Sequence, residues 1–331
     1  MRCINKNKAV ILAFMTVTGM ILGGCRQNQG TPVTEYEKNQ YNQNLYEDVL
    51  YAENLCVAQN EVTLETYTED TSVHSAALFN VSDRKVLYSY LSHERIYPAS
   101  TTKIMTALLA LENGNPEDQV TISSTAAASS LPADAQVCGL EQGEVWTLKD
   151  LVNALLLYSG NDAANAIAEH IAGSEEAFVG MMNKRARELM ANNTHFMNAH
   201  GLHDDNHYTT AYDLYLIFNE CIKNEQFVNS IQQESYTAVY SGTDGEPKEA
   251  VFKPTNLYAK GEAERPGNVT IIGGKTGTTE EAGNCLILLE KDLKDKYYIS
   301  IVMGASDKSV LYADMTSLIQ AIPETSSAAA E

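Results

Sequence analysis

A serine and a lysine three residues apart form the first pair in this chain whose types and spacing suit catalysis. Ser100 and Lys103 follow Pro98 and precede the apolar stretch 104–111, a pattern typical of a helix start. Residues three apart share a helix face, so the hydroxyl and the amine would point into one space above the positive helix N-terminus. This suits a nucleophile and its base, although a capped helix with a solvated lysine gives the same pattern.

Two further motifs offer groups that could relay a proton or bind a substrate beside such a pair. Ser159-Gly160-Asn161 falls on a predicted tight turn between helices, where a hydroxyl and an amide can face a cleft. Lys275-Thr276-Gly277 ends a predicted apolar strand behind two glycines, which allow a substrate backbone to approach closely. In this order the three motifs are the signature of penicillin-binding proteins and class A β-lactamases.

Longer stretches around the motifs resemble the D-alanyl-D-alanine carboxypeptidases among the low-molecular-weight penicillin-binding proteins. The similar segments are 99–108, 156–164, 194–202 and 275–283. The resemblance covers about residues 73–322 and implies a β-lactamase/transpeptidase-like α/β (α+β) fold. Such a fold has an antiparallel five-stranded sheet flanked by helices, with an inserted, mostly helical lobe.

The chain departs from this family at two places. Thr278 follows the third motif where many members have Tyr or His. The chain also ends soon after residue 322, so we expect no β-rich C-terminal domain or C-terminal membrane helix of the kind that many members carry.

The resemblance implies a role for each residue of the reaction. Ser100 attacks the terminal peptide bond of a peptidoglycan stem peptide ending in D-Ala-D-Ala and forms an acyl-enzyme that water hydrolyses. β-Lactam antibiotics acylate the same serine. Lys103 must be neutral to accept the proton, so its pKa must fall from ~10.4 to ~7. Burial and the positive charge of Lys275 are the expected causes.

The remaining motif residues are implied to relay a proton or to hold the substrate. Ser159 passes the proton to the leaving amine. Asn161 holds the substrate amide, and Lys275 and Thr276, with Gly277 beside them, hold the free carboxylate. The backbone N–H groups of Ser100 and Thr278 form the expected oxyanion hole. No cofactor is needed for this chemistry.

A class A β-lactamase and a catalytically silent penicillin-binding sensor or scaffold are the alternatives. Glu188 and Asn192 have the spacing of the Glu and Asn on the deacylating loop of class A enzymes. However, Glu188 falls in a charged, helical run that indicates a solvated face, and His200-Gly201-Leu202, typical of carboxypeptidases, follows. A sensor would retain acylation or lose it without turning over peptide.

A histidine-rich loop raises the possibility of a metal site. Its members are His195, His200, His203 and His207. They lack the His-Glu-x-x-His spacing, so we predict no metal and assign them to loop hydrogen bonds.

The N-terminus is typical of an exported lipoprotein. Three basic residues precede a short apolar run that ends in Leu22-Gly23-Gly24-Cys25, which resembles the bacterial lipobox. We therefore predict a signal peptide over residues 1–24, a lipid on Cys25, and anchoring on the outer face of the cell membrane. Residues 25–72 are the expected tether, 73–322 the catalytic domain and 323–331 a disordered tail.

Charge and cysteine content limit the other possibilities. The net charge of −20 argues against nucleic acid as a partner. Beyond Cys3 and Cys25 the cysteines are Cys56, Cys138, Cys221 and Cys285, with no Cys-x-x-Cys pair. Two disulfides and four buried thiols are both compatible with this spacing.

The periodicity of the chain places strands at both ends and helices between them. A hairpin is predicted over 75–90, helices over 100–113, 147–158, 162–171, 174–191 and 210–223, and strands at 120–122, 236–240, 269–274, 284–289 and 297–303. A last helix is predicted over 309–322. The sheet is expected to join the two ends of the chain.

Overall fold

The computed structural model describes residues 52–58 and 61–323. The chain divides after residue 53, and the elements below belong to the unit that begins at residue 54. The predicted signal peptide, Cys25, most of the predicted tether and nearly all of the predicted tail lie outside the described residues.

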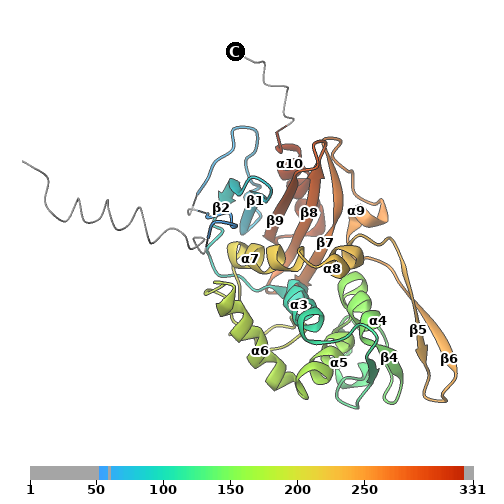
Figure 1. Cartoon of the computed structure of the whole chain (residues 1–331). Coiled ribbons are helices and arrows are strands. Elements are labelled where there is room, and N and C mark those ends of the chain that lie inside the picture. Colours follow the sequence, from blue (N-terminus) through green and yellow to red (C-terminus); the bar gives the residue numbers. More distant parts are fainter. Residues whose placement is uncertain (1–51, 59–60, 324–331) are drawn as a thin grey trace, which may run out of the picture. The chain divides into compact units, whose positions relative to one another are not determined.

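A five-stranded antiparallel sheet forms the centre of this unit (Figure 1). Its strand order is β2-β1-β9-β8-β7. The strands are β1 Ser75–Asn80, β2 Lys85–Tyr90, β7 Val269–Thr279, β8 Gly283–Asp292 and β9 Tyr297–Ala305. Because β1 pairs with β9, with Ala77 opposite Ile301, the two sequence ends meet in one sheet. The predicted five-stranded sheet is therefore confirmed.

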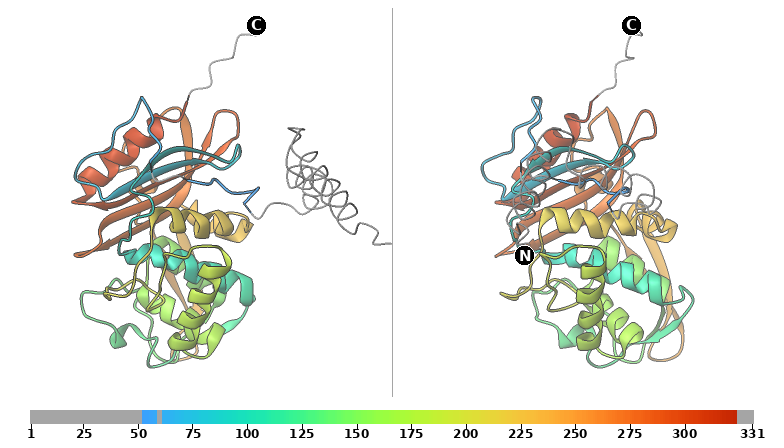
Figure 2. Two further views of the ribbon diagram at one scale, coloured as in Figure 1. Left: turned by 90° about the vertical axis from the view of Figure 1, so that its left-hand side faces the viewer. Right: turned by 60° about the vertical axis from the view of Figure 1, so that its left-hand side comes forward.

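The two faces of the sheet bury separate hydrophobic clusters. On one face Leu288 and Val302 pack with Leu311 and Met315 of helix α10 (Lys308–Gln320). On the other face Phe79 and its neighbours pack against the helical lobe. Figure 2 shows α10 on one side of the strands and the lobe on the other. The sheet is thus covered on both faces, as a layered fold requires.

The predicted helical lobe is also confirmed. Its helices are α3 Lys103–Asn113, α4 Leu148–Asn153, a π-helical turn η3 Ala154–Tyr158, α5 Asn161–Ala172, α6 Glu175–Glu188, α7 Ala211–Cys221 and α8 Glu225–Ile231. Thr147 caps α4, its hydroxyl accepting a hydrogen bond from Asp150 N at 3.1 Å. α8 and the short α9, Leu257–Lys260, were not predicted, because seven- and four-residue helices carry little periodic signal.

A second, four-stranded sheet lies along the lobe and was not predicted as a unit. It joins β3 Gln119–Thr121, β4 Val145–Thr147, β5 Tyr236–Ser241 and β6 Pro247–Phe252. Trp146 of β4 stacks on Tyr240 of β5, with ring centroids 3.9 Å apart. This contact between segments far apart in sequence is the tertiary information that the prediction lacked. β6 was missed because it begins with Pro, Lys and Glu, which are poor strand formers.

The structure also answers two open questions about the described part of the chain. All four cysteines there are free thiols, with Cys56, Cys221 and Cys285 buried and Cys138 partly buried. Among the same residues, no helix is both long enough and apolar enough to cross a lipid bilayer.

Candidate active site

Ser100 lies in a short 3-10 turn, η1 Ala99–Thr102, and α3 begins only at Lys103. The predicted helix start at residue 100 is therefore three residues early for α3, and no side chain caps either η1 or α3. The turn is instead fixed by Thr101, whose hydroxyl donates to Pro98 O at 2.6 Å. Ala99 has a φ of 47°, a left-handed conformation that is strained for a residue with a side chain. The nucleophile thus sits beside a constrained residue.

The Lys103 amine lies against Ser100 and two oxygen acceptors. Its Nζ is 2.9 Å from Ser100 Oγ, 2.6 Å from Asn161 Oδ1 and 2.6 Å from His200 O. A neutral amine has two N–H bonds and one lone pair. Because the two carbonyl oxygens can only accept, they take both N–H bonds, and the lone pair is left for the Ser100 hydroxyl. The geometry therefore fits a base that receives the serine proton.

Burial keeps the Lys103 amine from holding a proton in its ordinary range. The residue is fully buried, and desolvation, followed by the charge of Lys275, holds its pKa well below the usual value for lysine. Asp162 acts in the opposite direction but more weakly. Both predicted causes, burial and Lys275, are confirmed.

Lys275 is a second buried lysine, 1 % exposed, on strand β7. Its Nζ donates to Ser159 Oγ and to Thr276 O, each at 2.9 Å. Desolvation lowers the pKa of Lys275 to about 7. The two lysines therefore each hold one of the two motif serines, Lys103 the first and Lys275 the second.

Ser159 is positioned by an irregular helix end. The π-helical turn η3 ends at Ser159, which adopts a left-handed conformation with φ of 70°. π-Turns and left-handed non-glycine residues occur often at functional sites. This backbone geometry turns the Ser159 hydroxyl toward Lys275 and the cleft, where Ser159 is among the lining residues.

Strand β7 carries the third motif close to the nucleophile. A side-chain carbon added at Gly277 would lie 2.9 Å from Pro98 O and 3.0 Å from Ser100 N, so only glycine fits without a shift. This close approach brings the next residue, Thr278, to the same cleft as Ser100. The backbone N–H groups of Ser100 and Thr278 as an oxyanion hole stay a prediction.

A cleft of about 180 Å³ opens between these elements. Of the predicted site residues, five line it, while the side chains of Lys103, Asn161 and Lys275 lie behind that lining and contact its serines or one another. Along with Ser100, Ser159, Thr276, Gly277 and Thr278, the described lining comprises Gln136, Thr255, Leu257, Asn284, Cys285, Lys308, Leu311 and Tyr312. Asn161 thus faces Lys103, and its predicted contact with substrate stays a prediction.

Sequence reasoning missed the residues that build the other cleft wall. Asp162 is fully buried, and its carboxylate accepts hydrogen bonds from the backbone N–H groups of residues 138–140 at 2.8 to 3.0 Å. Gln136 O accepts from Asn161 N, and Thr255 Oγ1 lies 2.6 Å from Thr276 Oγ1. Only Asp162 carried a signal, as an acidic residue directly after the second motif at a helix start.

The histidine-rich loop packs against the η1 turn that carries Ser100. A side-chain carbon at Gly201, whose φ is 92°, would lie 1.9 Å from Ala99 O, so glycine is needed for this contact. His207 Nε2 lies 2.8 Å from Thr102 Oγ1. Burial lowers the pKa of His200 to about 3 and that of His207 to about 4. No group of three or more potential metal ligands occurs in the described part of the chain.

Glu188 does not reach the cleft. It ends α6, where it pairs with Lys184 at 3.5 Å and Arg185 at 3.6 Å on the lobe surface. The predicted solvated face is confirmed. A deacylating base of the class A β-lactamase kind at this position is therefore contradicted.

Comparison with known proteins identifies the family. The family model described as D-alanyl-D-alanine carboxypeptidase, Peptidase_S11, matches residues 61–307. D-alanyl-D-alanine carboxypeptidase DacF of Bacillus subtilis is 37% identical over 250 residues, which are 74% of this chain and 60% of that protein. DacC of Escherichia coli is 31% identical over 77% of this chain and 62% of its own length. The chain therefore spans about three fifths of the length of these relatives.

Solved structures agree with this result. The Streptomyces K15 DD-transpeptidase is similar with a TM-score of 0.71 at 28% identity, over 77% of this chain and 98% of that one. Penicillin-binding protein 5 of Haemophilus influenzae gives a TM-score of 0.68 at 27% identity, over 77% of this chain and 71% of that one. With the family model matched over most of the chain, this protein belongs to the D-alanyl-D-alanine carboxypeptidase (S11) family of serine peptidases.

Proposed function

We propose that the chain is a serine D-Ala-D-Ala carboxypeptidase that removes the terminal D-alanine from peptidoglycan stem peptides and is acylated by penicillin. One observation carries the proposal: a fully buried Lys103 amine, with both N–H bonds directed to carbonyl oxygens, lies 2.9 Å from Ser100 Oγ. The arrangement activates a hydroxyl without a metal ion or a histidine.

Acylation begins when Ser100 Oγ attacks the carbonyl carbon between the two D-alanines and its proton passes to Lys103. The negative charge formed on the carbonyl oxygen is stabilised by the Ser100 and Thr278 N–H groups, a contribution of about 3 kcal/mol per donor in comparable sites. The C–N bond then breaks, and Ser159 delivers a proton to the leaving D-alanine. The protons balance because Lys103 returns the one that it took.

Deacylation regenerates the serine. A water molecule attacks the ester carbon and loses a proton to Lys103. Lys103 passes this proton to the Ser100 oxygen as the ester C–O bond breaks, so both side chains return to their starting state. Lys275 and Thr276 hold the substrate carboxylate. Thr276 lines the cleft, and the Lys275 amine lies beneath the cleft surface, where it bonds Ser159 and supplies positive charge. In a β-lactam the bond broken in the first step is the ring amide, so the leaving amine stays attached and blocks the second step.

The decisive experiment is labelling of the full chain with fluorescent penicillin, followed by measurement of D-alanine released from a soluble pentapeptide. We expect both signals in the wild type and neither in Ser100→Ala. Ser317→Ala, at an exposed position of α10, is the matched control and keeps both. Labelling that persists in Ser100→Ala contradicts the acyl-enzyme. Labelling without D-alanine release indicates a sensor, and rapid loss of the label indicates a β-lactamase.

The proposed location is the outer face of the cell membrane, with a lipid on Cys25. The Leu22-Gly23-Gly24-Cys25 sequence after a basic and apolar leader supports this. Labelled palmitate should be incorporated into the wild type and not into Cys25→Ser, which should move to the soluble fraction. Palmitate incorporated equally into both proteins would place the lipid elsewhere.

A further inference from the structure

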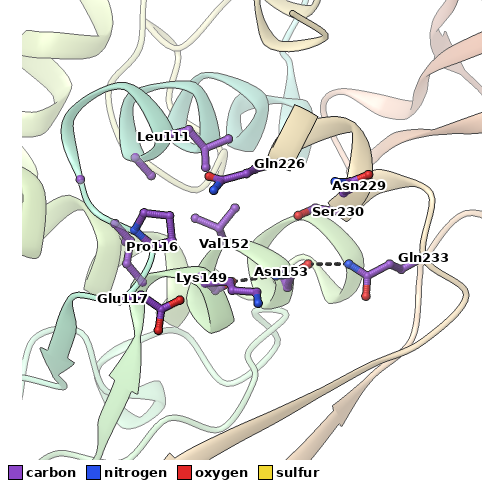
Figure 3. A pocket seen from close by; sticks show the side chains of 13 residues that line it. Leu111, Pro116, Glu117, Lys149, Val152, Asn153, Gln226, Asn229, Ser230 and Gln233 are labelled. Atoms are coloured by element: carbon purple, nitrogen blue, oxygen red, sulfur yellow. Dashed lines mark hydrogen bonds between the residues drawn. The ribbon is translucent and has the colours of Figure 1, made fainter. Parts of the chain in front are cut away.

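A cavity of about 270 Å³ lies in the helical lobe (Figure 3), at the ends of α3 and α4 that lie away from Ser100 and Ser159. It is bounded by the second half of α3, by α4 and by α8, and shares no lining residue with the catalytic cleft. Because its walls are helices, their side chains are held in fixed positions.

The floor of the cavity is apolar. Ala110, Leu148 and Val152 are buried there, and Leu111 and Pro116 extend the apolar surface to the rim. An apolar floor of this kind suits the C–H face of a small ring.

The hydroxyl of a largely buried serine faces this space. Ser230 of α8 is 5% exposed, and among the hydrogen bonds of the described residues none reaches its side-chain oxygen. In Figure 3 that oxygen points toward the space between Val152 and Gln226. Because no group of the described residues bonds this hydroxyl and the cavity gives access to it, it is available to donate to or accept from a polar ligand there.

Neutral amides surround the hydroxyl. Gln233 Nε2 donates to Asn153 Oδ1 at 2.9 Å, which leaves the Gln233 oxygen free to accept. Asn229 Oδ1 accepts from Gln232, which leaves the Asn229 NH₂ group free to donate. Gln226 offers a further amide at the mouth. The lining therefore offers both donors and acceptors.

The charge balance selects an uncharged ligand. The charged residues of the lining are Lys149 and Glu117, one of each sign. Neither an anion nor a cation is favoured by this pair, whereas a ligand with several hydroxyl or amide groups satisfies the amides and Ser230. The volume falls just below the range of about 300–1,000 Å³ for drug-sized ligands, so a single ring fits better than two.

From these features we infer that the cavity binds one neutral N-acetylated sugar ring of the peptidoglycan glycan strand. The inference rests on the proposed function, because a glycan strand is what the stem peptide is attached to. The sugar lays its C–H face on Leu111 and Val152, and its hydroxyl and acetamido groups bond to Ser230, Asn229 and Gln226.

The cavity is connected to the catalytic cleft through the helices that form its walls. α3 runs from Lys103 to the cavity, and α4 with η3 runs from the cavity to Ser159. The end of α8 packs against β7: a side-chain carbon at Gly273 would lie 2.0 Å from Ile231 O. A glycan held here keeps its stem peptides at high local concentration near the cleft. The enzyme is thus adapted to polymeric wall material more than to free peptides.

The binding test uses N-acetylglucosamine with the full chain carrying Ser100→Ala, so that turnover plays no part. We expect saturable NMR shift changes centred on Ser230 and Val152, with a dissociation constant of about 1 mM. Glucosamine, which carries a positive charge, should bind more weakly. Shift changes that do not saturate, or that centre elsewhere, overturn the inference, as does tighter binding of glucosamine.

Variants at the mouth and at the hydroxyl sharpen the test. Gln226→Trp should fill the mouth and weaken binding at least tenfold, while Glu225→Trp, on the same helix but outside the lining, should not. Ser230→Ala should weaken binding about fivefold, the usual effect of one neutral hydrogen bond. Because it removes an unpartnered hydroxyl, it should not lower the unfolding midpoint. Equal binding by Gln226→Trp and Glu225→Trp contradicts the site.

A second readout separates this inference from the proposed function. D-alanine release is measured from glycan-linked and from free pentapeptide in chains with an intact Ser100. The ratio of the two rates should fall in Gln226→Trp relative to Glu225→Trp. Equal ratios overturn the use of the site, whereas an enzyme that releases no D-alanine from either substrate contradicts the proposed function and leaves the sugar binding to be judged by NMR.

Discussion

Two buried lysines on one face of the central sheet have hydrogen-bond partners, whereas a buried glutamate on the other face has none among the described residues. On the lobe side, Lys103 and Lys275 are buried, and each amine contacts at least one serine and one oxygen acceptor. On the α10 side, Glu290 of β8 is equally buried, but neither of its carboxyl oxygens has a hydrogen-bond partner among the described residues. Burial alone therefore does not mark a functional group.

Burial shifts the pKa of the two lysines and of Glu290 in opposite directions. Desolvation lowers the pKa of both lysines and raises the pKa of Glu290 to about 8. The Ser300 hydroxyl opposes that rise, yet it too lacks a hydrogen-bond partner in the described structure. The lysines contact the two serines that line the cleft and can exchange protons with a substrate through them, whereas Glu290 is enclosed between sheet and helix. The difference teaches that the partners of a buried group, more than its depth, indicate catalysis.

The largest expected effect tests the lysine side of this contrast. Lys103→Met should lower the rate of fluorescent penicillin labelling about 10³-fold, the usual contribution of a general base. Circular dichroism should show that the variant is folded. Lys294→Met, in an exposed loop, is the control and should label at the wild-type rate. Wild-type labelling by Lys103→Met would remove Lys103 from the reaction.

Glu290 should affect stability instead of activity. Its folded pKa of about 8 lies above the value of 4.5 for an exposed carboxyl. The folded state therefore keeps a proton that the unfolded chain has released. The stability from the neutral carboxyl is fully present below about pH 4.5 and is lost as pH rises to about 8, a change on the order of 5 kcal/mol.

Glu290→Gln should flatten this dependence. Urea unfolding at several pH values should show the variant gaining on the wild type from pH 5 to pH 8, while penicillin labelling is unchanged. Parallel pH profiles for the two proteins would mean that Glu290 is already paired or solvated.

Gly201 tests whether the support beneath Ser100 is as rigid as its geometry indicates. Gly201→Ala places a carbon against Ala99 O in a left-handed conformation and should cost about 2 kcal/mol of unfolding free energy. It should also slow labelling, because His200 O is displaced from Lys103. Gly180→Ala, in α6 with open space around it, should be neutral or slightly stabilising. Similar changes in unfolding free energy for the two variants would show that the loop around Gly201 can move to accommodate the added carbon.

The smallest effect concerns the coupling of the two lysines. The charge of Lys275 lowers the pKa of Lys103, so Lys275→Gln should raise it. The acylation rate falls on the acid side where Lys103 becomes protonated. That limb of the pH–rate profile should therefore move to higher pH, by about one pH unit. An unmoved limb in the slower variant would mean that Lys103 is tuned by burial alone.

Much of the site could be predicted because its chemistry is carried by short motifs. Ser100 with Lys103, Ser159 and 275–278 are each recognisable from local sequence, and the structure brings them to one cleft. The central sheet was also predictable, since apolar strands at both ends of the domain need a common core. The second sheet was not, because the Trp146–Tyr240 stack joins residues that no local pattern connects.

The sequence by itself determined which groups this protein has for chemistry and in what order they occur. Only the tertiary structure decided their state. A lysine is charged or neutral according to the solvent and charges around it, and Lys103 is surrounded by Asn161, His200 and Lys275, which come from separate parts of the chain. The folded structure also decided that Asn161 faces Lys103 and that Asp162 holds the opposite wall. Long-range packing sets these contacts, so spacing along the chain cannot reveal them.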